Sequence, residues 1–262
     1  MLKPLGIRTR IREEWRSIKD VGIGARSEFR KDRKGAAYQA VFDEPEPLVT
    51  VCIGTFNRGR LLTERSIPSI LTQTYRNIEL IVIGDGCKDD TAKLVGAIDD
   101  PRLRFENLPE QGRYPDDPHH RWMVAGTAAV NRALSLARGA FVTHLDDDDE
   151  HDPSRIEKLL ATIRRERADL IYHPFRYEMP DGTWRTNEAD RFRAGKITTS
   201  SIFYHRRLAR IPWDVTAWKY LEPGDWNRLR KLRYLGIRKV RHPETLLTHY
   251  RERNQESAGR VV

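Results

Sequence analysis

Residues 140–149 read AFVTHLDDDD, an apolar run that passes directly into four consecutive aspartates. The run indicates a buried strand, and side chains of an extended chain alternate in direction, so Asp146 and Asp148 share one side. Carboxylates this close together repel one another unless a divalent cation neutralises them. An Asp-x-Asp pair suits Mg²⁺ or Mn²⁺, which complete their coordination with substrate phosphates. We therefore expect a metal and phosphate site here, with a solvated acidic loop as the alternative.

The residues that follow the aspartates predict a helix. Asp152 is typical of an N-cap and Pro153 of the first helical position. Apolar residues then recur at helical spacing, at Ile156, Leu159, Leu160 and Ile163. Asp152 is therefore expected to cap this helix and not to bind metal.

Strand and helix patterns alternate in the chain before and around the aspartates. Apolar runs predict strands at residues 48–53, 78–83 and 140–145, and the alternation around Leu103 and Phe105 predicts a strand at 102–108. Strands this apolar, with helical patterns between them, indicate an α/β, Rossmann-like and mostly parallel sheet covered by helices on both faces. Ligands of such sheets bind at the carboxyl ends of the strands. Three polar turns fall at those ends, at residues 54–58, 84–90 and 146–149.

Two common phosphate-binding loops are absent from the sequence. No Gly-x-Gly-x-x-Gly follows the first strand, and the chain has no Gly-Lys-Ser/Thr loop. Neither a dinucleotide fold nor a P-loop is therefore supported. Metal and arginine remain as the means of holding phosphate.

The composition limits the class of protein. The chain has 262 residues, with 47 Lys and Arg against 38 Asp and Glu and a net charge of +9, which suits anionic partners. Its two cysteines, Cys52 and Cys87, do not have the spacing of a disulfide framework or a zinc site. No run reaches the roughly 18–20 apolar residues of a membrane span, and no signal-peptide core is present. We expect a cytoplasmic protein, or one that touches the inner face of a membrane.

Residues 1–47 form a basic extension that we expect to be helical. Ile11, Trp15 and Ile18 recur at helical spacing among arginines and lysines. One interpretation is a helix that lies on an anionic membrane surface. The alternative is an extension that packs on its own domain or on a partner chain.

The C-terminal part is less regular and rich in aromatic residues. Trp184, Trp213, Trp218 and Trp226 are typical of a sugar-binding surface, or of ordinary core packing. Residues 222–226 read EPGDW and precede a helix expected at 226–235. Asp225 is therefore either the N-cap of that helix or a functional carboxylate.

Four blocks of sequence resemble the inverting family 2 glycosyltransferases of the GT-A type over residues 47–257. They are residues 49–58 (VTVCIGTFNR), 79–91 (ELIVIGDGCKDDT), 131–153 with the aspartates, and 224–226 (GDW). Each block is weak alone, but four in the usual order are specific. The chain departs from the family pattern at Gly84, where an aspartate is usual, and at Cys87, where a serine is usual.

The resemblance implies a role for each matching residue. The nucleotide would contact Thr55, Phe56, Asn57 and Asp85, with Phe56 stacking and Asp85 accepting hydrogen bonds from a base, which favours uridine. Asp148 would bind the metal directly, and Asp146 or Asp147 would contact ribose or a metal-bound water. Arg58 and Arg121 are candidates for the diphosphate. His249 is a candidate metal ligand, and Asp149 is expected to face solvent or to lie behind the ligands.

Asp225 matches the general base of the family. The resemblance implies transfer of a sugar from a nucleotide-sugar, UDP-sugar foremost, to a saccharide or lipid-linked acceptor, with inversion and with Mn²⁺ or Mg²⁺. A role in bacterial surface polysaccharide or glycolipid synthesis is expected. Residues 48–153 would form the nucleotide-sugar half of the domain and residues 154–262 the acceptor and catalytic-base half.

Two other classes of function remain open from sequence. One is a sugar nucleotidyltransferase, or a metal-dependent phosphohydrolase with Asp146, Asp148, His144 and His151 as ligands. Residues 54–60 are too poor in glycine for the nucleotidyltransferase, and His144 belongs to the strand. The other is a basic nucleic-acid-binding module, although no nucleic-acid motif is present and no nucleic-acid partner is expected. The oligomeric state is not predicted.

Overall fold

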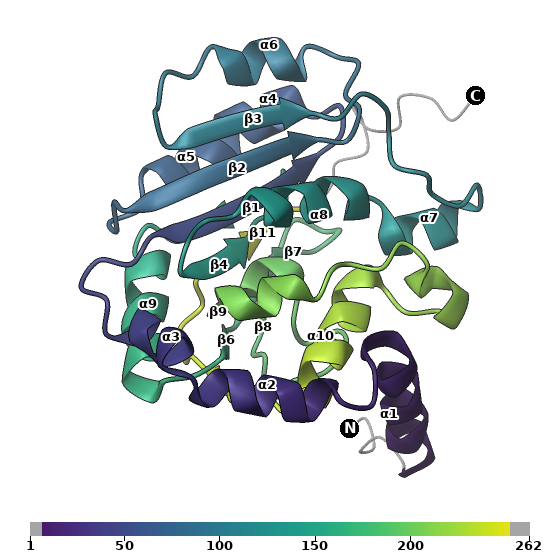
Figure 1. Ribbon diagram of the computed structural model, residues 1–262. Helices are drawn as coiled ribbons and strands as arrows, with labels where there is room; N and C mark the ends of the chain where they lie inside the picture. The colour runs from purple at the N-terminus through teal and green to yellow at the C-terminus, as the bar shows by residue number, and fades with distance from the viewer. Residues whose placement is uncertain (1–6, 252–262) are drawn as a thin grey trace.

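The structure is a computed structural model that describes residues 7–251, and it confirms the α/β class (Figure 1). The described chain contains a seven-stranded sheet in the order β10-β6-β9-β4-β1-β2-β3. Its strands are β1 (Val49–Thr55), β2 (Ile78–Gly84), β3 (Leu103–Asn107), β4 (Phe141–His144), β6 (Leu170–Tyr172), β9 (Ile202–His205) and β10 (Lys239–Arg241). β4, β1, β2 and β3 run parallel, whereas β9 is antiparallel to β4 and β6. The polar turns after β4, β1 and β2 therefore meet at one edge.

The centre of the sheet is buried on both faces. Every residue of β2 is buried, and so is nearly every residue of β1. Helix α8 (Thr127–Leu136) lies in front of β1 and β2 in Figure 1, and α5 (Ile67–Leu71) lies behind β2. Strands covered on both faces need apolar residues at successive positions, which is why β1 and β2 were predictable from the sequence.

The other helices around the seven-stranded sheet connect its strands or close its ends. They are α4 (Gly59–Leu61), the π-helical turn η2 (Leu62–Ser66), α6 (Thr91–Gly96), α7 (Pro118–Val124), α9 (Arg155–Glu166) and α10 (Gly224–Tyr234). A π-helical turn inside a helix often marks a functional site. Here η2 contacts the aspartate loop through Arg65 and Ser66.

A second, smaller sheet has the order β5-β11-β7-β8. Its strands are β5 (Glu150–His151), β7 (Phe175–Glu178), β8 (Trp184–Asn187) and β11 (Leu247–His249). β11 is antiparallel to β5, with Thr248 opposite Glu150. This pairing carries His249 to the aspartate loop. The irregular stretches nearby include the 3₁₀ turns η3 (Thr199–Ser201), η4 (Arg206–Arg210) and η5 (Ala217–Tyr220).

The N-terminal segment is helical and packs on the rest of the protein. It comprises α1 (Ile7–Val21), α2 (Ala25–Lys34), α3 (Ala36–Gln39) and η1 (Ala40–Phe42). Tyr38 is buried, its ring stacks on His205 with centroids 3.7 Å apart, and its hydroxyl donates to Asp169 at 2.7 Å. α1 packs against α10. Among the described residues, no helix combines the length and the apolar character needed to span a membrane.

Asp152 was expected to cap α9, and this prediction is wrong. α9 begins at Arg155, directly after Ser154, and Asp152 Oδ1 accepts from the backbone N–H of Ser154 at 2.9 Å. The backbone N–H of Asp152 donates to Leu246 O at 3.0 Å. α10 begins at Gly224, two residues before the predicted start, and Asp225 lies in its first turn.

Candidate active site

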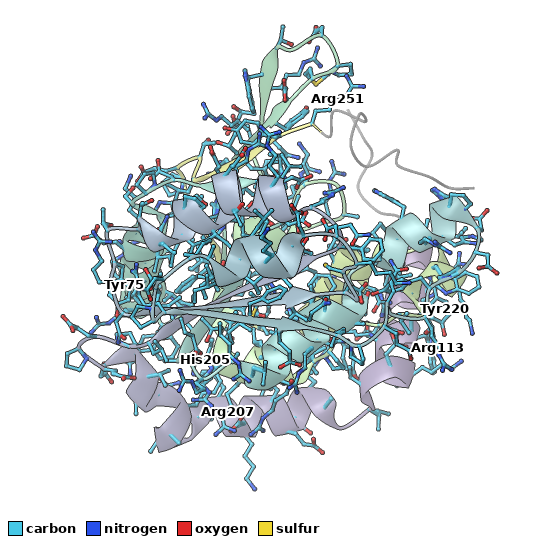
Figure 2. All side chains as sticks on the ribbon, turned by 90° about the horizontal axis from the view of Figure 1, so that it is seen from above. Tyr75, Arg113, His205, Arg207, Tyr220 and Arg251 are labelled. Carbon is cyan, nitrogen blue, oxygen red and sulfur yellow. The ribbon has the colours of Figure 1, made fainter. Side chains whose placement is uncertain are left out.

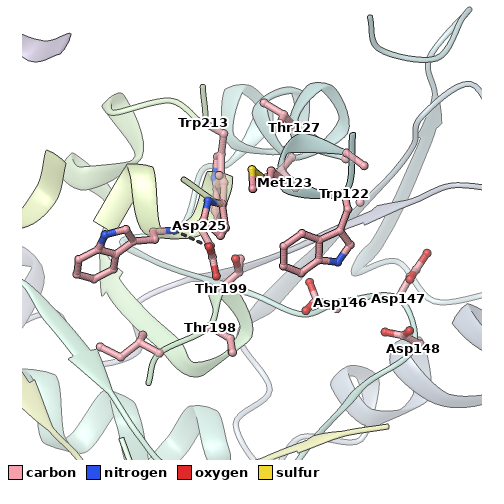
Figure 3. Close-up of a pocket in the computed structure, with 18 of the residues that line it drawn as sticks. Trp122, Met123, Thr127, Asp146, Asp147, Asp148, Thr198, Thr199, Trp213 and Asp225 are labelled. Atoms are coloured by element: carbon pink, nitrogen blue, oxygen red, sulfur yellow. Dashed lines mark hydrogen bonds between the residues drawn. The ribbon is translucent and has the colours of Figure 1, made fainter. Parts of the chain in front are cut away.

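A cavity of about 620 Å³ lies at the carboxyl ends of β1 and β4. Asp146, Asp147 and Asp148 line it together with Arg58, and Asp225 lines it from α10. In Figure 3 Asp225 lies on one side of the cavity, and Asp147 and Asp148 lie on the other. The structure therefore brings together carboxylates that are far apart in the sequence.

The backbone of the aspartate loop is held by side chains from two other segments. Ser66 Oγ donates to the carbonyl oxygens of Asp146 at 3.2 Å and Asp149 at 3.0 Å. Arg65 donates to the carbonyl of Asp148 at 2.7 Å. The backbone N–H of Asp146 donates to Ser200 Oγ at 3.0 Å. These bonds fix the loop conformation and leave the carboxylates directed elsewhere.

Arg58 neutralises the two middle aspartates. Its Nη1 donates to Asp147 Oδ1 at 3.0 Å and to Asp148 Oδ2 at 2.9 Å. Burial raises the pKa of Asp147 to about 6, against the opposing charge of Arg58. Arg58 follows β1 directly, which is the position expected for a residue that contacts the diphosphate.

Asp146, Asp149 and His249 form a candidate metal centre. Each offers one ligand atom, and these atoms all lie within 4.8 Å of one another. Asp149 is buried, so the expectation that it faces solvent is wrong. One of its oxygens accepts from the backbone N–H of Tyr250 at 3.0 Å, and the other faces His249 Nδ1. The pairing of β5 with β11 is the physical reason, because it closes the second sheet over this side chain.

In this cluster, charge and burial shift the pKa values in opposite directions. Burial raises the pKa of Asp149 to about 7, although His249 acts in the opposite direction. Burial alone would lower the pKa of His249, but its hydrogen bond with Asp149 and the negative charges of Asp149, Asp146 and Asp148 raise it overall. Two carboxylates and an imidazole at this spacing are a donor set that fits a divalent ion such as Mn²⁺. Asp148, expected as a direct ligand, instead contacts Arg58.

Asp225 lies in the opposite wall, and its neighbours on and before α10 form a network of hydrogen bonds and ion pairs. Burial raises its pKa to about 6. Glu222, three positions earlier, accepts from Asn227 at 3.0 Å and from Arg230 at 3.1 Å. Arg230 also donates to Asp20 of α1 at 2.7 Å. A carboxylate with a raised pKa in a cavity wall is suited to accept a proton near neutral pH.

Other residues predicted to bind nucleotide lie beside this cavity and not in its described lining. Thr55 ends β1 and is buried, and the Phe56 ring is 40% exposed, which leaves a face for stacking. Asn57 adopts a left-handed conformation with φ of 54°. Its Oδ1 accepts from the backbone N–H of Lys88 at 2.8 Å and so joins the turns after β1 and β2.

Asp85 and Arg121 have partners elsewhere in the protein. Asp85 is buried and accepts from the backbone N–H of Gly112 at 3.0 Å and from the Tyr114 hydroxyl at 2.7 Å. Arg121 lies on α7, next to lining residues, but donates to Pro115 O at 2.9 Å. Neither side chain points into the cavity in this arrangement.

Trp122, Ser200 and Arg155 were not predicted as part of the site. Trp122 lines the cavity on α7 and is 69% exposed. Trp213 and Trp226, which were expected in a sugar-binding surface or in core packing, line the cavity from the C-terminal part. Arg155 is fully buried behind the loop and donates to the carbonyl of Ser200 at 2.9 Å. A tryptophan beside a Pro-rich segment was a possible signal, whereas nothing in the sequence linked residue 200 to residue 146.

The histidines proposed as hydrolase ligands lie away from the candidate metal centre. His144 belongs to β4, as expected, and its Nε2 forms a hydrogen bond of 2.7 Å with the Tyr204 hydroxyl. His151 is buried. Among the described residues, the metal-binding cluster includes neither of them.

Comparison with known proteins supports the same family. The chain is 34% identical over 135 residues to the putative colanic acid biosynthesis glycosyl transferase WcaA of Escherichia coli, covering 50% of this chain and 42% of that protein. The chain spans less than half the length of the curated relatives it matches.

Solved structures share the GT-A fold. S. aureus TarS 1-349 in complex with UDP-GlcNAc matches with a TM-score of 0.59 and 17% identity, covering 82% of this chain and 61% of that one. A mannosyltransferase from Pyrobaculum calidifontis, in complex with GDP-Man and Mn²⁺, matches with a TM-score of 0.56 and 17% identity, covering 94% and 71%. The family model of glycosyl transferase family 2 matches residues 50–217, more than half of the chain. The chain therefore belongs to glycosyl transferase family 2.

Proposed function

We propose that this protein transfers a sugar from a nucleotide-sugar to an acceptor hydroxyl, with inversion and with the help of a divalent metal. One observation carries the proposal: a single cavity has an acidic cluster in one wall and the separate carboxylate Asp225 in the other. Inverting transfer needs this separation, because the leaving group and the attacking hydroxyl lie on opposite faces of the sugar.

The proposed chemistry assigns a task to each wall. Displacement of a nucleoside diphosphate builds negative charge on the leaving oxygen, which Mn²⁺ or Mg²⁺ bound by Asp146, Asp149 and His249 can neutralise. Arg58 lies beside the same aspartates and would contact the diphosphate. Asp225 would accept the proton of the acceptor hydroxyl as it attacks the anomeric carbon. Asp148 remains a candidate ligand if its pairing with Arg58 opens when the donor binds.

UDP is the proposed nucleotide. The proposal rests on the resemblance of the first two sequence blocks, and it agrees with the UDP-GlcNAc bound to S. aureus TarS. The mannosyltransferase of the same fold binds GDP-Man, so the nucleotide must be determined directly. Thr55, Phe56, Asn57, Asp85 and Arg121 stay proposed contacts of the nucleotide.

The proposed acceptor is a saccharide or a lipid-linked sugar in bacterial surface polysaccharide or glycolipid synthesis. The relative named for colanic acid biosynthesis supports this assignment. The reaction would take place in the cytoplasm or at the inner face of the membrane. Trp122, Trp213 and Trp226 in the cavity lining offer apolar faces on which a pyranose ring can pack.

Calorimetric titration with UDP, with and without Mn²⁺, tests the donor site. We expect UDP binding that depends on the metal. In a separate screen of UDP-, GDP- and dTDP-sugars as donors, one of them is expected to release its sugar. Tight binding of GDP with no binding of UDP would overturn the choice of nucleotide. Salt-sensitive binding of nucleic acid without any effect of UDP would overturn the transferase itself.

A further inference from the structure

Helix α1 packs on the protein with its polar face. Glu13 accepts from Arg233 at 2.6 Å, and Ser17 and Asp20 each accept from Arg230 at 2.7 Å. Glu13 and Ser17 are buried. A surface helix normally buries its apolar face, whereas α1 buries these polar residues together with Ile18 and Val21.

The opposite face of α1 presents apolar residues to solvent. Ile11 is 51% exposed and Trp15, one turn further, is 69% exposed. Ile18, which the sequence analysis placed in the same stripe, instead packs against the core. Arg12, next to Ile11, and Lys19, one turn after Trp15, are also exposed.

Glu14, beside this pair on α1, already has a partner, since it accepts from Arg26 at 3.1 Å. Further basic side chains, Arg30, Lys31 and Lys34, are exposed on α2, together with one carboxylate, Glu28. The exposed charges of α1 and α2 among the described residues are therefore mostly positive.

Further exposed apolar residues lie close to α1. Ile23, in the turn between α1 and α2, is 82% exposed, and Leu221 is 69% exposed. Leu221 follows Tyr220, whose ring lies under the Arg16 guanidinium of α1 at 4.9 Å. Figures 1 and 2 show α1, Tyr220 and α7 on the same side of the molecule. α7 carries Trp122 of the cavity, so the cavity lies on this side as well.

We propose that α1 docks the protein on an anionic lipid surface, with Ile11 and Trp15 inserted among the lipid headgroups and Arg12 and Lys19 on the phosphates. Tryptophan and basic residues on one helix face are suited to this environment. A second copy of the chain is a poorer occupant. Two or three side chains of this size cover roughly 200–500 Å², whereas a stable interface needs about 800 Å² from each partner.

The docked orientation has a consequence for the acceptor. With α1 on the lipid surface, α7, whose Trp122 lines the cavity, lies on the same side of the molecule as that surface. A lipid-linked acceptor could then enter without leaving the surface. This step rests on the proposed function, whereas docking itself does not.

Vesicle co-sedimentation of the full chain tests docking without any donor or acceptor. The probes are vesicles of phosphatidylcholine alone and of phosphatidylcholine with phosphatidylglycerol at about two to one, since anionic lipid supplies the negative surface potential. We expect binding to the anionic vesicles only, reduced by salt, and at least about tenfold weaker for Ile11→Ser/Trp15→Ser. Trp184→Ser, which removes an exposed tryptophan of β8, is the matched control and should bind like the parent.

A second variant guards against loss of folding. The variant Arg12→Gln/Lys19→Gln keeps the apolar pair. It should bind anionic vesicles at least about tenfold more weakly than the parent, because each basic residue near the surface contributes to the attraction. Equal binding of the parent and both double variants would overturn the proposal, as would absence of binding by the parent. A dimeric parent in light scattering that Trp15→Ser converts to a monomer would assign the face to a second copy.

Discussion

The two walls of the cavity are built in different ways. The aspartate wall, Asp146 to Asp148, follows a strand at the centre of the sheet, and short hydrogen bonds to its backbone hold it. The base wall, Asp225, lies in the first turn of α10, a helix that is joined to the distant segment α1 by the ion pair of Arg230 with Asp20. Arg230 and Asp20 are 210 residues apart in the sequence, and Arg16 and Glu222 are 206 apart.

The two walls therefore differ in how far apart in the sequence the segments that support them lie. The aspartate wall takes its position from the sheet, which forms from successive apolar residues. The base wall belongs to α10, which packs on α1, the same helix that we propose to lie on a lipid surface. The binding side of the reaction is therefore built into the core, while the proton-accepting side is connected to the surface of the molecule.

The largest expected effect comes from removing the proposed base. Asp225→Asn should lower kcat by about two to four orders of magnitude, because the amide cannot accept the proton of the acceptor hydroxyl. Metal-dependent binding of UDP, measured by calorimetry, should stay close to that of the parent, since the aspartate wall is intact.

Asp99→Asn is the control for Asp225→Asn. Asp99 is exposed between α6 and β3, outside the cavity lining, and its replacement should have no effect on turnover. Turnover retained by Asp225→Asn would remove this residue from the role of base. Loss of UDP binding in the same variant would mean that the two walls are not independent.

The next effect concerns stability. Arg230 is 1% exposed and binds Asp20 and Glu222, whose side chains are 10% and 9% exposed. Arg230→Met should lower the free energy of unfolding by about 3–5 kcal/mol, because Asp20 loses this partner and Glu222 keeps Arg16 and Asn227 but loses its most buried cation. Urea denaturation measures this change.

Arg132→Met tests whether burial is the cause. Arg132 pairs with Glu106 at 2.6 Å, but both side chains are largely exposed, so the free energy of unfolding should hardly change. If the two variants were equally destabilised, the base wall would not depend on its buried ion pairs in the way proposed here.

The same contrast explains how much could be predicted from the sequence. The strands up to Leu145 and the aspartates after them were predictable, because burial on both faces produces an apolar run that ends in a polar turn. The position of Asp149 was not, since it depends on the pairing of β5 with β11 about 100 residues later. Trp122, Ser200 and Arg155 were missed for a similar reason: their roles depend on contacts between segments that share no pattern.

A smaller effect, on the affinity for UDP and Mn²⁺, is expected at the candidate metal centre beside the aspartate wall. His249→Ala should weaken Mn²⁺-dependent binding of UDP by roughly 10- to 100-fold, as loss of one supporting or direct ligand commonly does. Asp148→Ala distinguishes the two possible ligand sets. If Asp146, Asp149 and His249 hold the ion, Asp148→Ala should reduce affinity for Mn²⁺ less than His249→Ala does. The reverse order would make Asp148 the direct ligand and His249 a neighbour.

The pH dependence of turnover gives the smallest effect and returns to the base wall. Asp225 acts as a base only when ionised, and burial raises its pKa to about 6. Activity should therefore be complete above this pH, and log(kcat/KM) should fall by about one unit for each pH unit below it. A bound cation would shift this limb to lower pH, because positive charge favours the carboxylate. The residual rate of Asp225→Asn provides the control and should stay flat through the same range. A limb that persists in Asp225→Asn belongs to another group, and the base wall would then have to be sought elsewhere in the cavity.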